Sequence, residues 1–456
     1  MKKHLILLFM ALLAFPAVSQ TEDEGEGEFI EVSDESEAEL SANPITQRYR
    51  LGNGLRFTLP SGNRLTLNAL IQTTADVRRY EGVDKTFSRF RMRRARLGFA
   101  GHLLNDKLRV RLTLDLVKGS ETDEDNGTLL QDAYLTYRPW GQKLQISFGQ
   151  KSTPTDNLEL MMGSHTLQFA DRSKLSSAFG TIRELGVFVE SSLNLRGAGV
   201  LRPRLAVTDG DGPIGNFDRR YGGLKYGARV SYLPLGTFRN YGVSREGDMA
   251  YEFDPKLSVG VAYSYADGTS DRRGGRSNGD ILYKNDKDRI DLPDYGKLTA
   301  DVLFKYRGFT LLGEFAKTWG YVPKSITQRV RNDGTTSTKF DVDGEQNIEG
   351  YIKNRMMLGE GYNIQAGYML RSMWSFDLRY THIRPDKYSF LHNDLYFNRH
   401  NFYDVSVAKY LARNYAVKVQ LTAGLARSAG ENRTPDGNYT WHGNEWTGSL
   451  MVSFKL

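Results

Sequence analysis

Apolar and polar residues alternate along most of this chain, in segments of about ten residues. The clearest segment alternates Leu108, Val110, Leu112, Leu114 and Leu116 with Arg109, Arg111, Thr113 and Asp115. Similar segments run from Leu257 to Tyr265 and from Tyr415 to Leu421. Because strand side chains point to opposite faces in turn, each segment predicts a β-strand with one apolar and one polar face. A soluble β-sandwich would show the same period, so the alternation alone leaves both architectures open.

The links between these segments favour a barrel. We predict sixteen strands near 65–79, 89–100, 108–118, 129–137, 143–150, 184–193, 199–207, 223–232, 257–266, 297–305, 310–319, 361–370, 375–383, 403–410, 415–425 and 447–456. Long links (80–88, 119–128, 151–183, 208–222, 267–296, 320–360, 384–402 and 426–446) alternate with mostly tight ones, and only 233–256 breaks this rule. A transmembrane antiparallel β-barrel has this segregation, with short periplasmic turns and long extracellular loops. The fold class expected is therefore all-β, a barrel of about 16 strands with both termini in the periplasm.

The first sixty residues differ from the rest. Residues 1–19 predict a cleaved signal peptide, with Lys2 and Lys3 followed by an apolar run and the small residues Ala17-Val18-Ser19. Between Glu22 and Glu39 lie ten acidic residues and no basic one, so residues 20–60 predict an acidic, mostly disordered periplasmic segment. The barrel is then expected to occupy residues 61–456, and partner binding by the acidic segment is left open.

Composition fits an outer-membrane barrel. The chain is polar on average, with a mean hydropathy of −0.49, yet it contains 25 Tyr and 23 Phe, as expected for strands banded by interfacial aromatics. It has no cysteine, which excludes disulfides, thiol chemistry and Cys-based metal sites. The alternating final strand, from Trp446 to Leu456, resembles the signal read by the outer-membrane insertion machinery. We therefore expect export to the bacterial outer membrane, in contact with lipid and lipopolysaccharide.

Three segments resemble a known family. FRMRRARLGFAG (Phe90–Gly101), LLQDAYLTYRPWGQKLQISFGQ (Leu129–Gln150) and FADRSKLSSAFGTIRELGVFVE (Phe169–Glu190) are similar to the phosphate-selective porin O and P family. The resemblance covers most of the chain after about residue 60 and is strongest from 87 to 190. It implies a sixteen-stranded, homotrimeric channel that passes phosphate or other small anions. Its motifs specify the fold better than the solute.

Charges on the polar faces suggest an anion preference. If the apolar residues of each strand face lipid, then Arg94, Arg96, Arg109, Arg111, Lys225 and Arg229 point into the lumen, as do Lys297, Lys305, Arg379 and Lys418. We expect Arg94, Arg96, Arg109 and Arg111, on adjacent strands, to form one basic patch. The alternative is that acids such as Asp115, Asp301 and Asp377 balance these cations. Another alternative is that arginines bind lipopolysaccharide phosphates or pair with acids between subunits.

The link 151–183 is the best candidate for the constriction, because loops longer than about fifteen residues are usually functional. It is also the third long link, and the third long loop of porins generally folds into the lumen. Its basic residues are Lys151, Arg172, Lys174 and Arg183. Arg172 and Arg183 are the preferred constriction residues because both lie within the third family-like segment.

Three functions remain open at this point. They are an anion-preferring porin, a porin for a sugar or peptide, and a structural barrel whose pore is plugged by the loops 267–296 and 320–360. The histidines are scattered and no GxSxG motif is present, so we predict no enzyme activity, catalytic residue, metal or cofactor. Nothing points to a nucleic-acid partner.

Overall fold

A computed structural model describes residues 51–456, except 118–128, 214–221, 277–278, 280, 393–395, 397–398 and 429–442. The predicted signal peptide and most of the predicted acidic segment lie outside the described residues. Within the described part, no helix has the length and apolar character needed to span a membrane.

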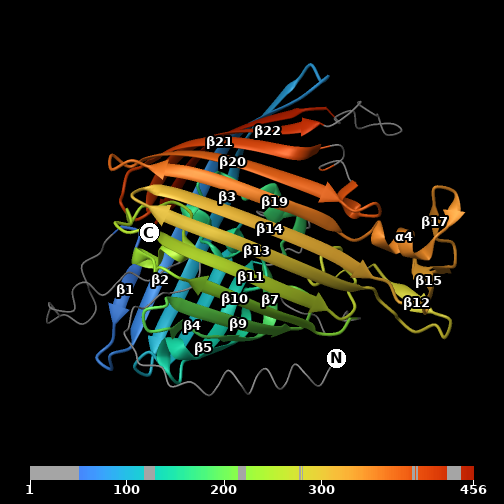
Figure 1. The fold of residues 1–456 in the computed structure, drawn as a ribbon, viewed down its shortest axis with the longest axis horizontal. Helices are drawn as coiled ribbons and strands as arrows, with labels where there is room; N and C mark the ends of the chain where they lie inside the picture. Colours follow the sequence, from blue (N-terminus) through green and yellow to red (C-terminus); the bar gives the residue numbers. More distant parts are fainter. Residues whose placement is uncertain are drawn as a thin grey trace.

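Sixteen antiparallel strands close into a barrel (Figure 1). In order around the wall they are β2 (Arg64–Tyr80), β3 (Thr86–Leu103), β4 (Leu108–Asp115), β5 (Leu130–Tyr137), β6 (Gln145–Ser152), β7 (Arg183–Glu190), β9 (Val200–Thr208), β10 (Lys225–Leu233), β11 (Lys256–Ala266), β13 (Asp294–Tyr306), β14 (Phe309–Tyr321), β19 (Gly359–Met369), β20 (Trp374–Pro385), β21 (Arg399–Tyr410), β22 (Val417–Ser428) and β23 (Glu445–Lys455). The last strand pairs with β2, from Leu70↔Lys455 to Tyr80↔Glu445. The predicted sixteen-stranded barrel is thus confirmed, with one strand for each predicted segment.

The alternation of faces follows the predicted parity. Outward side chains are exposed, among them Leu112 (40%) and Val261 (50%). Their neighbours Thr113 and Ala262 face the lumen, where they are 0% and 1% exposed. These lumen-facing positions are buried because other parts of the chain fill the barrel.

The links alternate between two ends of the barrel, here called the turn side and the loop side. On the turn side, β13 and β14 are joined by Arg307 and Gly308, both with positive φ (48° and 89°). A side chain at Gly308 would also meet the carbonyl oxygen of Met369, which explains the glycine. On the loop side, β2 and β3 extend further than predicted, so their link is only residues 81–85.

The described part of the barrel begins before the predicted boundary at residue 61. Strand β1 (Leu55–Thr58) pairs with the first residues of β2, from Leu55↔Leu67 to Thr58↔Arg64. Just before it, the amide of Gly54 donates to the carbonyl of Leu456. This part of the expected disordered segment is therefore a strand, because its backbone finds partners on β2 and at the C-terminus.

Short elements occupy the links. They are η1 (Gly141–Lys143), α2 (Leu158–Met161), η2 (Ser164–Thr166), α3 (Lys174–Phe179), β8 (Leu193–Asn194), η4 (Arg239–Ser244), β12 (Tyr283–Asn285), β15 (Ile326–Val330), β16 (Thr336–Ser337), β17 (Asp341–Val342), β18 (Glu345–Gln346), α4 (Ile348–Lys353) and η5 (Phe390–His392).

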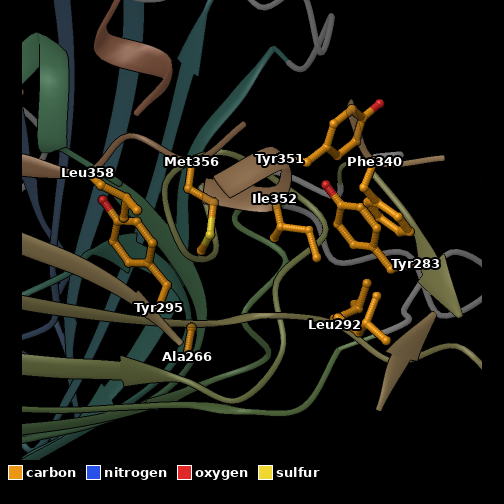
Figure 2. Close-up of a cluster of buried hydrophobic side chains, with 10 residues drawn as sticks. Ala266, Tyr283, Leu292, Tyr295, Phe340, Tyr351, Ile352, Met356 and Leu358 are labelled. Atoms are coloured by element: carbon orange, nitrogen blue, oxygen red, sulfur yellow. The ribbon is translucent and has the colours of Figure 1, made fainter. Parts of the chain in front are cut away.

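The two longest loop-side links build a small cap from β12, β15–β18 and α4. Its apolar core includes Tyr283, Phe340, Tyr351 and Ile352, shown in Figure 2. The cap lies past the loop-side ends of β13 and β14 (Figure 1). These elements therefore pack on one another, while other residues of the two links reach the segment between β6 and β7. Arg273 donates to the carbonyls of Ser177 and Ala178, both at 3.1 Å, and Met357 packs with Leu175 and Phe179.

Candidate functional site

The lumen loop, residues 153–182, joins β6 to β7 and crosses the inside of the barrel. Most of its residues are buried. Its Asp156 forms an ion pair with Lys297 of β13. Oε1 of its Glu159 lies 3.5 Å from Nη1 of Arg379 on β20. Its Gln168 bonds to Asp377 of β20. The loop is thus held by strands on several sides of the lumen.

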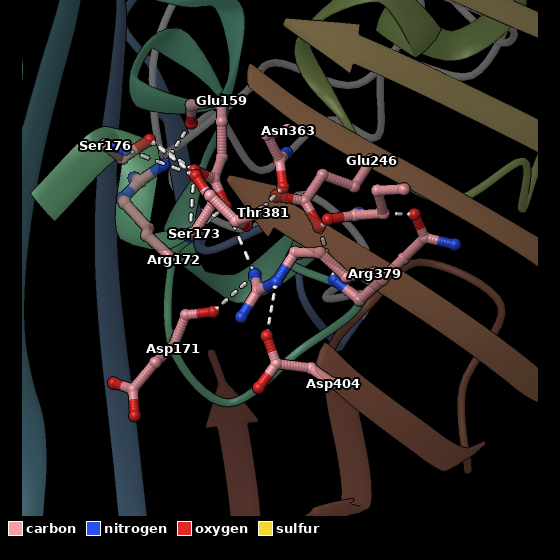
Figure 3. Close-up of polar contacts among 12 residues, drawn as sticks. Glu159, Asp171, Arg172, Ser173, Ser176, Glu246, Asn363, Arg379, Thr381 and Asp404 are labelled. Atoms are coloured by element: carbon pink, nitrogen blue, oxygen red, sulfur yellow. Dashed lines mark hydrogen bonds and ion pairs between the residues drawn. The ribbon is translucent and has the colours of Figure 1, made fainter. Parts of the chain in front are cut away.

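Glu159 organises the middle of the lumen loop (Figure 3). Its carboxylate accepts hydrogen bonds from the backbone amide (2.8 Å) and hydroxyl (2.7 Å) of Ser173, and from the hydroxyl of Ser176. Arg379 faces this carboxylate and also donates to Asp404 at 2.9 Å. Ser173 caps α3 by accepting the amide of Ser176. The loop therefore has a defined conformation before any solute enters.

Arg172 takes part in the same arrangement. Its guanidinium donates to the backbone carbonyls of Glu159 and, at 3.0 Å, of Met162. The Met162 carbonyl follows the last residue of α2, where no intrahelical donor remains, whereas the Glu159 carbonyl also accepts the amide of Met162 at 3.2 Å. The structure thus places this predicted constriction residue where it supports the fold of the lumen loop.

A second segment, the inward link (residues 234–255 between β10 and β11), enters the lumen from the turn side. Lys305 of β13 donates to its carbonyls at Gly242 (2.7 Å) and Gly247 (2.9 Å). Glu246 of the link accepts the backbone amide of Gln168 at 2.6 Å, so the two inserted segments touch. Burial, together with the charge of Glu159, raises the pKa of Glu246 to about 7.

One cavity of about 100 Å³ lies between these inserted segments and the wall formed by β4–β7 and β9–β11. Its basic lining residues are Arg111, Lys151, Arg183, Arg202 and Arg204, and its acidic ones are Asp132 and Glu190. The charge on the lining is therefore mainly positive.

Two ion pairs lie within this wall. Lys151 Nζ is 2.6 Å from Glu190 Oε1, and Arg183 Nε is 3.0 Å from Asp132 Oδ1. The lining also includes Arg111, Arg202 and Arg204, so its five cations outnumber its two carboxylates. Lys151, Arg183 and Arg111 were selected from the sequence, and the structure brings all three to one cavity.

The expected single patch of four arginines is not formed. Arg96 of β3 pairs with Asp115 of β4, whereas Arg111 pairs with Ala100, four residues further along β3. At about 3.4 Å per residue, this register separates Arg96 from Arg111 by roughly 13 Å along the strands. The alternation of faces along each strand correctly predicted that all four side chains point inward. Which of them lie close together depends on the register between β3 and β4.

Other predicted cations also have polar partners. Their partners are Gln72 for Arg94 (2.8 Å), Asp115 and Ser164 for Arg96 (2.7 and 3.0 Å), Asp106 for Arg109 (2.9 Å), Glu184 for Lys225, and Asp301 for Arg229 (2.7 Å). Lys174 lies 5.9 Å from the centre of the Phe402 ring. Most of the buried cations are thus compensated, as the alternative reading of the sequence allowed.

Arg93, Arg202 and Arg204 also face the lumen but were not selected from the sequence. Arg202 and Arg204 alternate with less polar neighbours on β9, so parity could have identified them. Arg93 could not be found this way. A register shift between Gln72 and Thr73 places it at a β-bulge, where it turns inward and pairs with Asp171 of the lumen loop.

The described residues contain no group of three or more His, Asp or Glu side chains that could hold a metal ion. A closed barrel of sixteen strands around a polar interior, with a long loop folded inside, defines the class of outer-membrane porins. Residues 67–266 match the model of the family described as phosphate-selective porin O and P. The resemblance predicted from the sequence is thereby confirmed over that part of the chain, and it indicates a channel in the outer membrane.

Similar solved structures include the outer membrane channel DcaP of Acinetobacter baumannii, with 13% identity and a TM-score of 0.47, covering 88% of this chain and 99% of that chain. The trimer form of OmpT from Vibrio cholerae is 8% identical, with a TM-score of 0.48, and the match covers 86% of this chain and 99% of that one. A mutant of the Rh. blastica porin is 12% identical, with a TM-score of 0.42, covering 86% and 100%. No curated protein sequence matches this chain.

Proposed function

We propose that this chain is an anion-preferring porin whose conducting path runs along the basic wall, off the axis of the barrel. The observation that carries the proposal is the cavity between the lumen loop and the wall, where basic side chains outnumber acidic ones. Positive charge on a narrow path lowers the entry cost of an anion and opposes cations.

Arginine suits a path along which an anion must be bound and then released. Its planar guanidinium can hold two oxygens of a phosphate or carboxylate. In the cavity, the pairs Lys151–Glu190 and Arg183–Asp132 already neutralise part of the charge. A partly compensated wall binds a passing anion weakly enough to release it, which conduction requires.

The remaining parts of the proposal follow from the family resemblance and the N-terminal sequence. The signal peptide is cleaved during export, and the insertion machinery recognises the final strand β23. The mature protein assembles as a homotrimer surrounded by lipid and lipopolysaccharide. The permeating solutes are small anions, with phosphate or polyphosphate as the class that the family name suggests.

Reversal potentials in a KCl gradient across a planar bilayer test the anion preference. The wild type should show a chloride-selective potential, and the double variant Arg202→Gln with Arg204→Gln should lose a substantial part of it. The matched control is Arg384→Gln, at an exposed position of β20 that does not line the cavity. High salt should reduce the difference by screening. A cation-selective wild type would refute the proposal.

A second candidate is a structural barrel with a closed pore. The contact between Gln168 and Glu246 favours it, because the two inserted segments meet in the lumen. Under this alternative, folded protein that shifts mobility on boiling would show no ion conductance in any salt. Shortening the inward link would then create a conductance that the wild type lacks.

A further inference from the structure

We infer that the cavity selects small organic carboxylates with an apolar carbon skeleton over inorganic phosphate. This inference rests on the proposed anion path and concerns the solute that the path accepts. It starts from the composition of the cavity, whose lining includes a charged group and an apolar group of side chains beside serine and glutamine residues.

The charged side belongs to the barrel wall. Arg111 of β4 and Arg202 and Arg204 of β9 point inward beside the two ion pairs described above. Arg202 is buried, at 6% exposed, so its charge acts with little screening by bulk water. A carboxylate can accept two parallel hydrogen bonds from such a guanidinium.

The apolar side belongs to the two inserted segments and the end of β10. Leu158 and Met161 come from the lumen loop, Leu233 from β10 and Val243 from the inward link. All four belong to one apolar cluster, which also contains Phe238. The apolar side is therefore a packed surface rather than a set of scattered side chains.

The two sides meet directly. Nη1 of Arg204 lies 3.5 Å from Sδ of Met161, so a cationic group and an apolar side chain are neighbours in one cavity. A solute that places a carboxylate at the guanidinium must lay its next carbons against the thioether. This juxtaposition matches an anion with a short hydrocarbon chain.

Inorganic phosphate lacks the part that would use the apolar side. All its oxygens are strongly hydrated, and those turned toward Leu158 or Val243 would lose water without gaining a donor. A methylene group buried there gains about 0.8 kcal/mol, or roughly four-fold in affinity. At about 100 Å³ the cavity is smaller than the roughly 300 Å³ of pockets for drug-sized ligands, which restricts the solute to a few carbons.

The test compares two monocarboxylates of six carbons, hexanoate and gluconate, with inorganic phosphate as a third probe. Each is added to a bilayer containing the wild-type channel in KCl, and the concentration that halves the chloride current is measured. Two buried methylenes predict that hexanoate acts at a concentration at least ten-fold below that of gluconate. Phosphate should also require more than hexanoate. Equal values for hexanoate and gluconate, or a lower value for phosphate, would overturn the inference.

Two isosteric variants locate the effect. Met161→Gln and Val243→Thr each replace an apolar group of the cavity by a polar one of similar size. Each variant should raise the concentration of hexanoate that halves the chloride current at least three-fold relative to the corresponding concentration of gluconate. Met249→Gln is the matched control, because Met249 lies in the same inward link but packs in a different apolar cluster and does not line the cavity.

The outcomes separate the two proposals. A wild type without chloride selectivity in a KCl gradient refutes the anion path, whatever hexanoate does. A chloride-selective channel without preference for hexanoate leaves the anion path standing and refutes this inference alone. A preference that survives both variants also refutes it, since the cavity would then not be its source. If one variant fails to fold, the other and the wild-type comparison still decide.

Discussion

Glu246 connects the two segments that fill the lumen, so it tests whether their contact responds to pH. Its Oε2 accepts hydrogen bonds from the amide of Gln168 and, at 2.9 Å, from Gln365 of β19. Its Oε1 is buried and has no hydrogen-bond partner among the described residues. The perturbation is Glu246→Gln, which keeps the shape and one acceptor oxygen but removes the titration.

The magnitude follows from the pKa. Burial, and then the negative charge of Glu159, raise the pKa of Glu246 from its ordinary 4.5 to about 7. A group whose pKa is raised by folding contributes stability that is fully present below its ordinary pKa and lost as pH rises through the raised value. Each pKa unit corresponds to about 1.36 kcal/mol. Ionisation of Glu246 should therefore lower the free energy that holds the inward link in the lumen by about 3 kcal/mol above pH 7.

The assay measures single-channel conductance, and the midpoint temperature of the gel-mobility shift, between pH 5 and 9. In the wild type, the inward link should release as pH rises through about 7, so conductance should increase and the midpoint should fall. Glu246→Gln should flatten both curves. Glu252→Gln is the control, because Glu252 accepts the amide of Arg239 within the same link and does not contact the lumen loop.

An unchanged pH dependence in Glu246→Gln would refute the reasoning. It would mean that a group other than Glu246 produces the pH dependence. A wild-type conductance that is flat from pH 5 to 9 would refute it equally, since the contact would then be insensitive to this charge.

Three further changes probe the wall and the lumen loop. Leu112→Arg should destabilise the barrel by about 2–4 kcal/mol in urea titrations if the site lies near the bilayer midplane. The control Leu112→Ile should destabilise it by less than about 1.5 kcal/mol. Equal losses of stability in the two variants would mean that this face does not meet lipid. Arg229→Leu should lower the free energy of unfolding by about 3–5 kcal/mol, because it leaves Asp301 buried without its partner. Adding Asp301→Leu should recover much of that stability, and a double variant whose loss equals the sum of the two single losses would contradict this. Asp156→Asn removes the ion pair with Lys297 and should loosen the lumen loop, seen as larger and noisier single-channel currents; identical currents would show that other bonds hold the loop.

Much of the barrel could be predicted from the sequence because its cause is local. The direction of a side chain alternates along a strand whatever lies around it, so Leu112 and Thr113 were assigned to opposite faces from their own segment. The inward direction of Arg94, Arg96 and Arg111 followed in the same way. The inward link was marked by its length, since 233–256 was the one link that broke the short-turn rule.

The sequence by itself thus determined the strands, their number, their two faces and the family resemblance, because each depends on patterns within a short segment. Only the tertiary structure decided which inward side chains meet, because register and bulges are set by pairing between strands. It separated Arg96 from Arg111, turned Arg93 inward, and brought Met161 of the lumen loop against Arg204 of the wall. It also decided that the lumen is filled by the lumen loop and the inward link, because contacts between residues far apart in the sequence, such as Gln168 and Glu246, have no local signature.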